Sequence, residues 1–281
     1  MQSSCGVTQD CALQPSPAGY VVCTGLHIAS PIAASPECAQ MSTLLDSAQL
    51  ATQLVWQGDA ELWRIVGLSV RVSLMACVLG GVLGLALGAW LAVARFPGWR
   101  GVIWVLNTLL ALPSVVVGLL VYLLLSRAGP LGAYGLLFTP TAMVFAQSVL
   151  VTPLIAALTR RLVQDALAEG GDQLRSLGAS PYAAALLMLL HERRAVLTIG
   201  LTAFGRAVSE VGAVMIVGGN INGVTRVMTT AIALETSKGD LALALALGAV
   251  LLGVVALLNL AVAVLHGAAQ AAGQRREAWV A

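Results

Sequence analysis

The chain has 281 residues, of which 58% are hydrophobic and only 10% are charged. A soluble domain carries roughly a quarter charged residues, so this chain has too few charges to cover a soluble globule. Its net charge of +2 provides no basic field for nucleic acid, and we expect no nucleic-acid partner. The length suits one membrane domain and does not require a second, soluble one.

The first forty residues differ from the rest of the chain. Residues 1–40 have no helical period and hold four of the five cysteines, without a CxxC pair that would predict a zinc or redox site. No basic segment precedes an apolar core, so they do not match a signal peptide. Met41 opens a more ordinary sequence, and we interpret residues 1–40 as a poorly structured extension upstream of the natural start. Residues 41–64 predict an amphipathic lead-in at the membrane surface.

Five segments are apolar enough to cross a bilayer, which takes about 20 residues of helix. They are residues 65–94, 102–125, 136–158, 195–217 and 241–265. We therefore predict an all-α membrane protein with about five transmembrane helices over residues 65–265, followed by a tail at 266–281. Gly80, Gly84 and Gly88 line one face of the first segment and predict close packing against a neighbouring helix. Pro113 and Pro153 predict interruptions of the second and third segments.

Basic residues in the loops between these segments predict the orientation of the chain. One side would hold nine of them: Arg95, Arg100, Arg160, Arg161, Arg175, Arg193, Arg194, Arg275 and Arg276. The other side would hold four: Arg64, Arg127, Arg226 and Lys238. Because basic loops stay in the cytoplasm, we expect the N-terminus outside and the C-terminus in the cytoplasm.

The most informative stretch is the loop at residues 159–194, which is too polar to span the membrane. Leucines at helical spacing predict a helix that Gly178 ends in a left-handed conformation. Ser180 as cap and Pro181 in the first turn predict that a short apolar helix follows. We interpret this helix–turn–helix as a docking element presented to the cytoplasm. The alternative is an amphipathic loop that rests on the membrane.

Two charged residues lie in the middle of the fourth segment. Arg206 and Glu210 are four residues apart and can pair on one helix face. A lone arginine at this depth costs at least about 2.5–3.5 kcal/mol on insertion scales. One interpretation is that Arg206 lines a path and gives a dianion a counter-charge, while Glu210 holds it in place. The alternative is a purely structural pair. Arg71, nearer the outer end of the first segment, is expected to extend to the interface.

A glycine- and asparagine-rich turn follows the fourth segment at residues 218–223. Its residues, among them Asn220, favour positive φ and exposed amide hydrogens. Thr225, Thr229 and Thr230 add hydroxyl groups. Such a nest of donors can accept an oxyanion that arrives from outside. The alternative is a plain turn followed by a helix at the interface.

Several of these segments resemble one family. Residues 172–180, Asp-Gln-Leu-Arg-Ser-Leu-Gly-Ala-Ser, resemble the Glu-Ala-Ala-x-x-x-Gly loop of ATP-binding-cassette (ABC) importer permeases. Asp172 stands where the family has Glu, and His191 stands where a later motif has Pro. Residues 111–132 are similar to the second-span signature of oxyanion permeases. Residues 205–225 are similar to the molybdate and tungstate branch, and residues 226–239 are closer to tungstate permeases.

The resemblance covers about residues 60–265 and implies a type I (MetI-like) permease bundle for an oxyanion, tungstate, with molybdate or sulfate as alternatives. It implies a second permease copy, a cytoplasmic ATPase dimer that uses ATP and Mg, a periplasmic binding protein and a bacterial or archaeal cytoplasmic membrane. The implied ATPase-coupling residues are Asp172, Leu177, Gly178, Ala179 and Ser180. The path or gate residues would be Arg206, Glu210, Asn220, Thr225, Thr229 and Thr230.

Enzymatic activity in this chain itself is not expected. The sequence has no GxxxxGK[ST] loop for ATP phosphates, no HExxH zinc motif and no GxSxG elbow. We therefore expect no cofactor and no metal in this chain. The main alternative is an ion-coupled secondary transporter. Such a transporter would be built from inverted repeats, and five segments cannot be divided into two equal repeats. A membrane scaffold that transports nothing is the other alternative.

Overall fold

A computed structural model describes residues 49, 53, 56 and 60–280, except the side chains of residues 242 and 265–280. All of the regular structure in this part is helical. The elements are α2 (Ala60–Val93), α3 (Trp99–Ala111), α4 (Ser114–Leu125), η1 (Gly132–Tyr134), α5 (Pro140–Ser176), α6 (Pro181–His191), α7 (Arg193–Val208), α8 (Gly212–Gly218), α9 (Met228–Lys238) and α10 (Leu241–Val280). The predicted extension at residues 1–40 lies outside the described residues. Of the predicted lead-in, residues 60–64 begin α2.

The number of spans agrees with the prediction, but two of them are not straight. Three helices are long and apolar enough to cross a membrane, and the number is five if each of two bent helix pairs counts as one span. The predicted span at 102–125 is bent by 102° between α3 and α4, and the span at 195–217 is bent by 59° between α7 and α8. Pro113 explains the first bend, because proline lacks an N–H group and forces the preceding Leu112 into an extended conformation, with ψ 132°.

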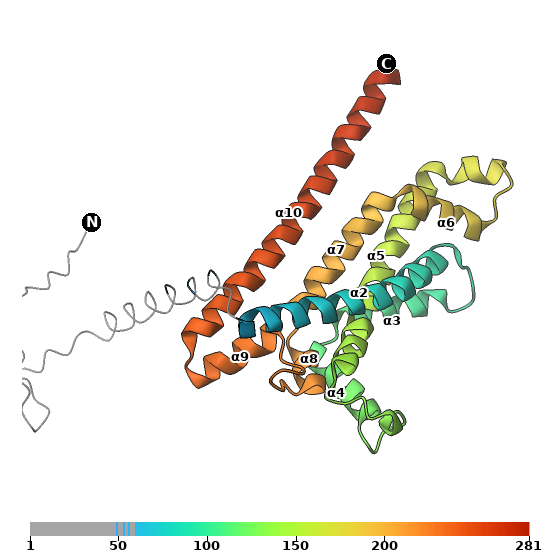
Figure 1. Cartoon of the computed structure of the whole chain (residues 1–281). Coiled ribbons are helices and arrows are strands. Elements are labelled where there is room, and N and C mark those ends of the chain that lie inside the picture. Colours follow the sequence, from blue (N-terminus) through green and yellow to red (C-terminus); the bar gives the residue numbers. More distant parts are fainter. Residues whose placement is uncertain (1–48, 50–52, 54–55, 57–59, 281) are drawn as a thin grey trace, which may run out of the picture. The chain divides into compact units, whose positions relative to one another are not determined.

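The first span packs along the third. A Cβ atom added at Gly84 would lie 2.7 Å from Cβ of Ile155, and one added at Gly88 would lie 2.5 Å from the carbonyl oxygen of Ala156. The glycine face of α2 is therefore the face that contacts α5, as the spacing predicts. Figure 1 shows these two helices crossing within the bundle.

Two helices extend well beyond the apolar segments that predicted them. The third segment was predicted to end at residue 158, but α5 continues through Pro153 to Ser176 and includes most of the helix predicted before Gly178. Likewise, α10 continues through residues predicted as a tail. Hydropathy predicts only where a helix leaves the hydrocarbon core. The helix itself continues into water until a helix-ending residue such as glycine interrupts its backbone hydrogen bonds.

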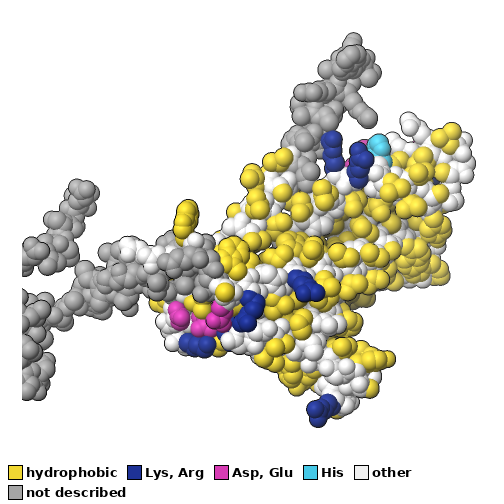
Figure 2. All heavy atoms as spheres, viewed as in Figure 1, with side chains coloured by type: hydrophobic (Ala, Val, Ile, Leu, Met, Phe, Trp, Pro, Cys, Tyr) yellow, Lys and Arg dark blue, Asp and Glu magenta, His cyan; other side chains and the backbone are white. Residues whose placement is uncertain are grey.

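The half-helices α4 and α8 pack side by side. Val117 and Val121 of α4 share a buried cluster with Ala213 and Val217 of α8. A Cβ atom added at Gly118 would lie 2.6 Å from Cα of Ala213, so this contact requires a glycine. Figure 2 shows hydrophobic side chains over most of the visible face, with few charged side chains among them, as expected of a surface that meets lipid.

Candidate functional site

The turn between α5 and α6 has the geometry that its sequence predicts. Gly178 has φ 80°, a left-handed conformation that glycine adopts without strain. Its N–H donates to the carbonyl of Arg175 at 2.9 Å, and the N–H of Ala179 donates to the carbonyl of Leu174 at 3.0 Å. These two bonds satisfy the last carbonyls of α5 and fix the direction in which the chain leaves it.

The start of α6 is capped as predicted. Oγ of Ser180 accepts a hydrogen bond from the N–H of Ala183 at 3.3 Å, and Pro181 occupies the first turn. Ala185 of α6 packs in a buried cluster with Ala92 of α2 and Val163 of α5. The short helix is therefore held against two spans, and Figure 1 places it at one end of the bundle.

The predicted coupling residues lie at the exposed tip of this hairpin. The side chain of Leu177 is 82% exposed, although it is apolar. Asp172 is also exposed and pairs with Arg175 at 3.4 Å. Tyr182, Leu186 and Leu190 of α6 are exposed as well. Exposed apolar side chains at a polar end of the molecule form a surface suited to another protein.

The predicted charge pair in the fourth span forms across the break between α7 and α8. Nη1 of Arg206 donates to Oε2 of Glu210 at 2.7 Å. Glu210 lies between the two helices rather than on one helix face, and its Oε1 accepts from the N–H of Ala213 at 3.4 Å. The carboxylate is 4% exposed, whereas the arginine side chain is 50% exposed. The pair therefore links the two halves of the span and leaves part of Arg206 accessible.

Two residues from other helices hold the same break. Nε2 of the buried Gln147 in α5 donates to the carbonyl of Ala207 at 3.0 Å. Oγ1 of Thr229 in α9 donates to the carbonyl of Glu210 at 2.8 Å. These bonds satisfy carbonyls that lose their helical partners where α7 ends. The sequence prediction missed Gln147, although a glutamine in an otherwise apolar segment could have identified it.

The loop between α8 and α9 has the positive φ angles expected of it, with Gly219 at 69° and Asn220 at 49°. Its hydroxyl groups bind the backbone of the chain itself. Oγ1 of Thr225 donates to the carbonyl of Gly218 at 2.6 Å, and Oγ1 of Thr230 accepts from the N–H of Val227 at 3.2 Å. In this conformation the threonines stabilise the loop, and an oxyanion-binding role for them stays a prediction.

Charged residues also join this loop to the ends of α2 and α9. Arg226 lies 3.7 Å from Glu61 of α2 and 3.9 Å from Glu235 of α9, and Lys238 lies 3.0 Å from Glu235. The buried Glu235 carboxylate thus has two cations beside it. In the part of the chain that the structure describes, no group of three or more His, Cys, Asp or Glu residues could hold a metal ion.

Comparison with known proteins identifies the family. The chain is 43% identical over 213 residues to the tungstate uptake system permease protein TupB of Peptoclostridium acidaminophilum, across 75% of this chain and 93% of that protein. The chain belongs to the ABC transporter permease family, in the branch of the tungstate uptake permeases. A probable anion ABC transporter permease protein of Haloferax volcanii is 41% identical over 206 residues, covering 70% of the permease described here and 89% of the relative. TupB of Campylobacter jejuni is 36% identical over 216 residues, covering 77% and 90% respectively.

Sulfate transport permeases are also similar to this permease, at lower identity. No family model matches the chain. The relatives confirm the predicted resemblance to ABC permeases of the tungstate branch. The permease is a multi-pass membrane protein, as its apolar helices require.

Proposed function

We propose that this permease forms the membrane path of an importer that takes up tungstate, and that the α5–α6 turn docks on a separate ATPase subunit. The single observation that favours docking most is the exposed Leu177 on a turn fixed by the bonds of Gly178 and Ala179. A turn of fixed geometry transmits displacement to α5, which it ends, and through α6 to α2, against which α6 packs. ATP and Mg would act in the partner, since this chain has no phosphate-binding loop.

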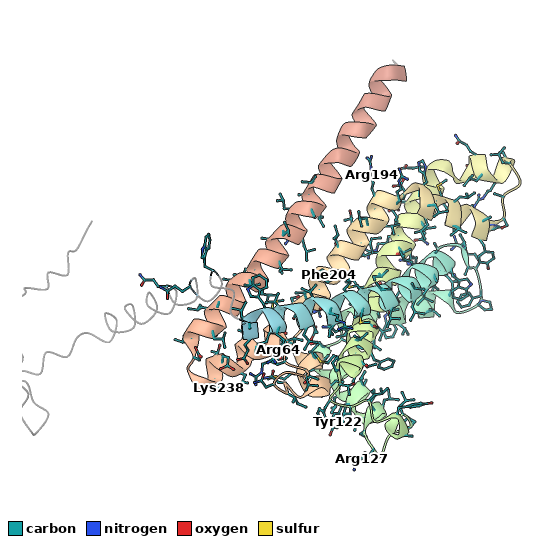
Figure 3. All side chains as sticks on the ribbon, in the orientation of Figure 1. Arg64, Tyr122, Arg127, Arg194, Phe204 and Lys238 are labelled. Atoms are coloured by element: carbon teal, nitrogen blue, oxygen red, sulfur yellow. The ribbon has the colours of Figure 1, made fainter. Side chains whose placement is uncertain are left out.

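The proposed machine has two permease copies, an ATPase dimer and a periplasmic binding protein. The α5–α6 turn would face the cytoplasm and the N-terminus the outside. Figure 3 supports this orientation, because Arg194 lies at the end of the bundle where α6 lies, whereas Arg127 and Lys238 lie toward the other end. Arg194 belongs to the larger of the two predicted basic groups, which would remain in the cytoplasm.

Tungstate is the proposed substrate because two of the similar relatives are tungstate uptake permeases. Arg206 supports an anion path, since its half-exposed guanidinium can attract a dianion while Glu210 keeps the net charge of the site low. A site of low net charge lets an anion pass without trapping it. Molybdate is the alternative that shares this charge and shape. Sulfate is the less favoured alternative, because the sulfate permeases are similar at lower identity.

Uptake by the reconstituted complex tests the proposal. The permease, its ATPase and its binding protein would be placed in proteoliposomes and supplied with labelled tungstate, molybdate or sulfate. We expect uptake of tungstate to exceed that of sulfate and to stop when ATP, Mg or the ATPase is left out. Uptake that follows an ion gradient without the ATPase would contradict the proposal.

A further inference from the structure

A groove of about 610 Å³ lies on the surface between α2 and the first turn of α5. Its walls include Met75, Val78 and Leu79 of α2 and Val144 of α5, all apolar. Met75, Val78 and Leu79 are each at least half exposed, so the groove is open along its length. One cation, Arg71, lines the same groove.

Arg71 differs from Arg64 and Arg226, which have partners within the chain. It is exposed, and among residues 60–264 it makes no hydrogen bond or ion pair with another residue. Arg226 pairs with two carboxylates, and Arg64 donates to Asn222 at 3.3 Å. An arginine in a membrane span is costly unless an anion or water meets it, so Arg71 is free to meet a group from outside the chain.

The position of Arg71 suits the membrane surface. The groove also contains Pro140 and Thr141, which begin α5, so Arg71 lies at the level where α5 enters the bilayer. Leu79 lies eight residues further along α2 and therefore about 12 Å deeper. The groove thus combines a cation at the interface with apolar walls that extend toward the hydrocarbon core.

We propose that this groove binds one anionic phospholipid, with its phosphate on Arg71 and an acyl chain along Met75 to Leu79. A guanidinium binds phosphate with two hydrogen bonds, and lipid tails match the apolar walls. A dianionic substrate fits poorly, because the walls offer it few donors. A carboxylate of a second permease copy is the competing partner for Arg71, but it would leave the apolar walls of the groove without an occupant. This inference requires only that the chain spans a membrane.

Native mass spectrometry of the purified full-length permease tests the site with phosphatidylglycerol and phosphatidylcholine. Both lipids carry a phosphate, but the choline cation of phosphatidylcholine offsets its charge. We therefore expect the wild type to bind phosphatidylglycerol about fivefold more tightly, the effect of one exposed ion pair. Arg71→Gln should abolish this preference, and Arg127→Gln, an exposed cation away from the groove, should keep it. Val78→Phe should weaken the binding of both lipids, because the larger side chain fills the groove. Val82→Phe lies one turn further along α2 and outside the groove, and it should leave the binding of both lipids unchanged.

Three results would overturn the proposal. The first is equal preference in the wild type and Arg71→Gln. The second is displacement of the lipid by excess inorganic phosphate, which would make the groove a site for free anions. The third is efficient photo-crosslinking from residue 78 to another copy in native membranes, which would make this face a permease–permease contact. Crosslinking from residue 78 that favours phosphatidylglycerol over phosphatidylcholine in mixed bilayers supports the proposal even if Arg71→Gln folds poorly.

Discussion

Nη1 of Arg206 lies 2.7 Å from Oε2 of Glu210, and the two residues lie on either side of the point where α7 ends. The carboxylate is almost completely buried, and its second oxygen binds the start of α8. Half of the Arg206 side chain remains exposed. The pair therefore has a structural task, which is to join the two halves of a bent span, and still leaves a cation that an anion could reach.

Separating these two tasks requires a double substitution. Arg206→Ala leaves the buried Glu210 carboxylate without its cation, and we expect a loss of about 1–3 kcal/mol in the free energy of unfolding. Arg206→Ala combined with Glu210→Gln removes that buried charge and should recover most of the stability. If Arg206 lines the path, tungstate uptake should stay low in the double variant. Thermal unfolding in detergent and uptake in proteoliposomes measure the two effects.

Arg206→Lys serves as the control, because it keeps the charge and should retain part of the uptake. Recovery of uptake together with stability in the double variant would show that the pair is only structural.

Thr229→Val tests how the break in the fourth span is held. The substitution removes the hydroxyl that donates to the carbonyl of Glu210 at 2.8 Å and keeps the shape of the side chain. We expect the permease to lose about 1–3 kcal/mol of stability, because a buried carbonyl loses a donor. Thr202→Val removes an exposed hydroxyl that binds its own helix, and its melting temperature should stay near that of the wild type. Equal melting temperatures for the two variants would contradict this role of Thr229.

Gly88→Ala and Gly81→Ala form a matched pair on α2. A methyl group at residue 88 would meet the backbone of Ala156 at 2.5 Å, whereas one at residue 81 would meet nothing within 4 Å. We expect Gly88→Ala to destabilise the permease by about 1–3 kcal/mol through overpacking. Gly81→Ala should be neutral or stabilise by up to about 1 kcal/mol, since alanine favours helix. Similar melting temperatures for both would show that α2 does not approach α5 this closely.

Gly178→Val tests the turn between α5 and α6. At φ 80° a residue with a Cβ atom is strained by about 1–2 kcal/mol, and valine tolerates this conformation poorly. We expect normal membrane insertion but a several-fold loss of the ATPase stimulation that substrate-loaded binding protein produces. Gly178→Asn should retain most of it, because asparagine adopts this conformation more readily. Stimulation at the wild-type level in Gly178→Val would contradict the coupling role.

Features fixed by neighbouring residues were predictable from the sequence. The end of α5 just before Gly178, the start of α6 at Ser180 and Pro181, and the break at Pro113 all follow from local backbone chemistry. The glycine face of α2 was predictable too, because its spacing needs no knowledge of the partner helix.

Features fixed by distant contacts were not predictable. The break between α7 and α8 contains no proline, and it is held by Gln147 and Thr229, which lie 60 and 19 residues from the carbonyls that they bind. The 102° bend at Pro113 also depends on the packing of α4 against α8, since proline ends a helix without setting the direction of the next one. Periodicity within one segment contains no information about such partners.

Photo-crosslinking from residue 177 tests the central claim most directly. A photoactivatable amino acid would replace Leu177 in the permease, expressed with its ATPase and binding protein, and a control would place it at Leu252, an exposed position on α10. We predict that residue 177 crosslinks to the ATPase subunit and that residue 252 does not. Labelling of residue 177 from the outside of intact cells, or no crosslink to the ATPase from an active complex, would contradict the account.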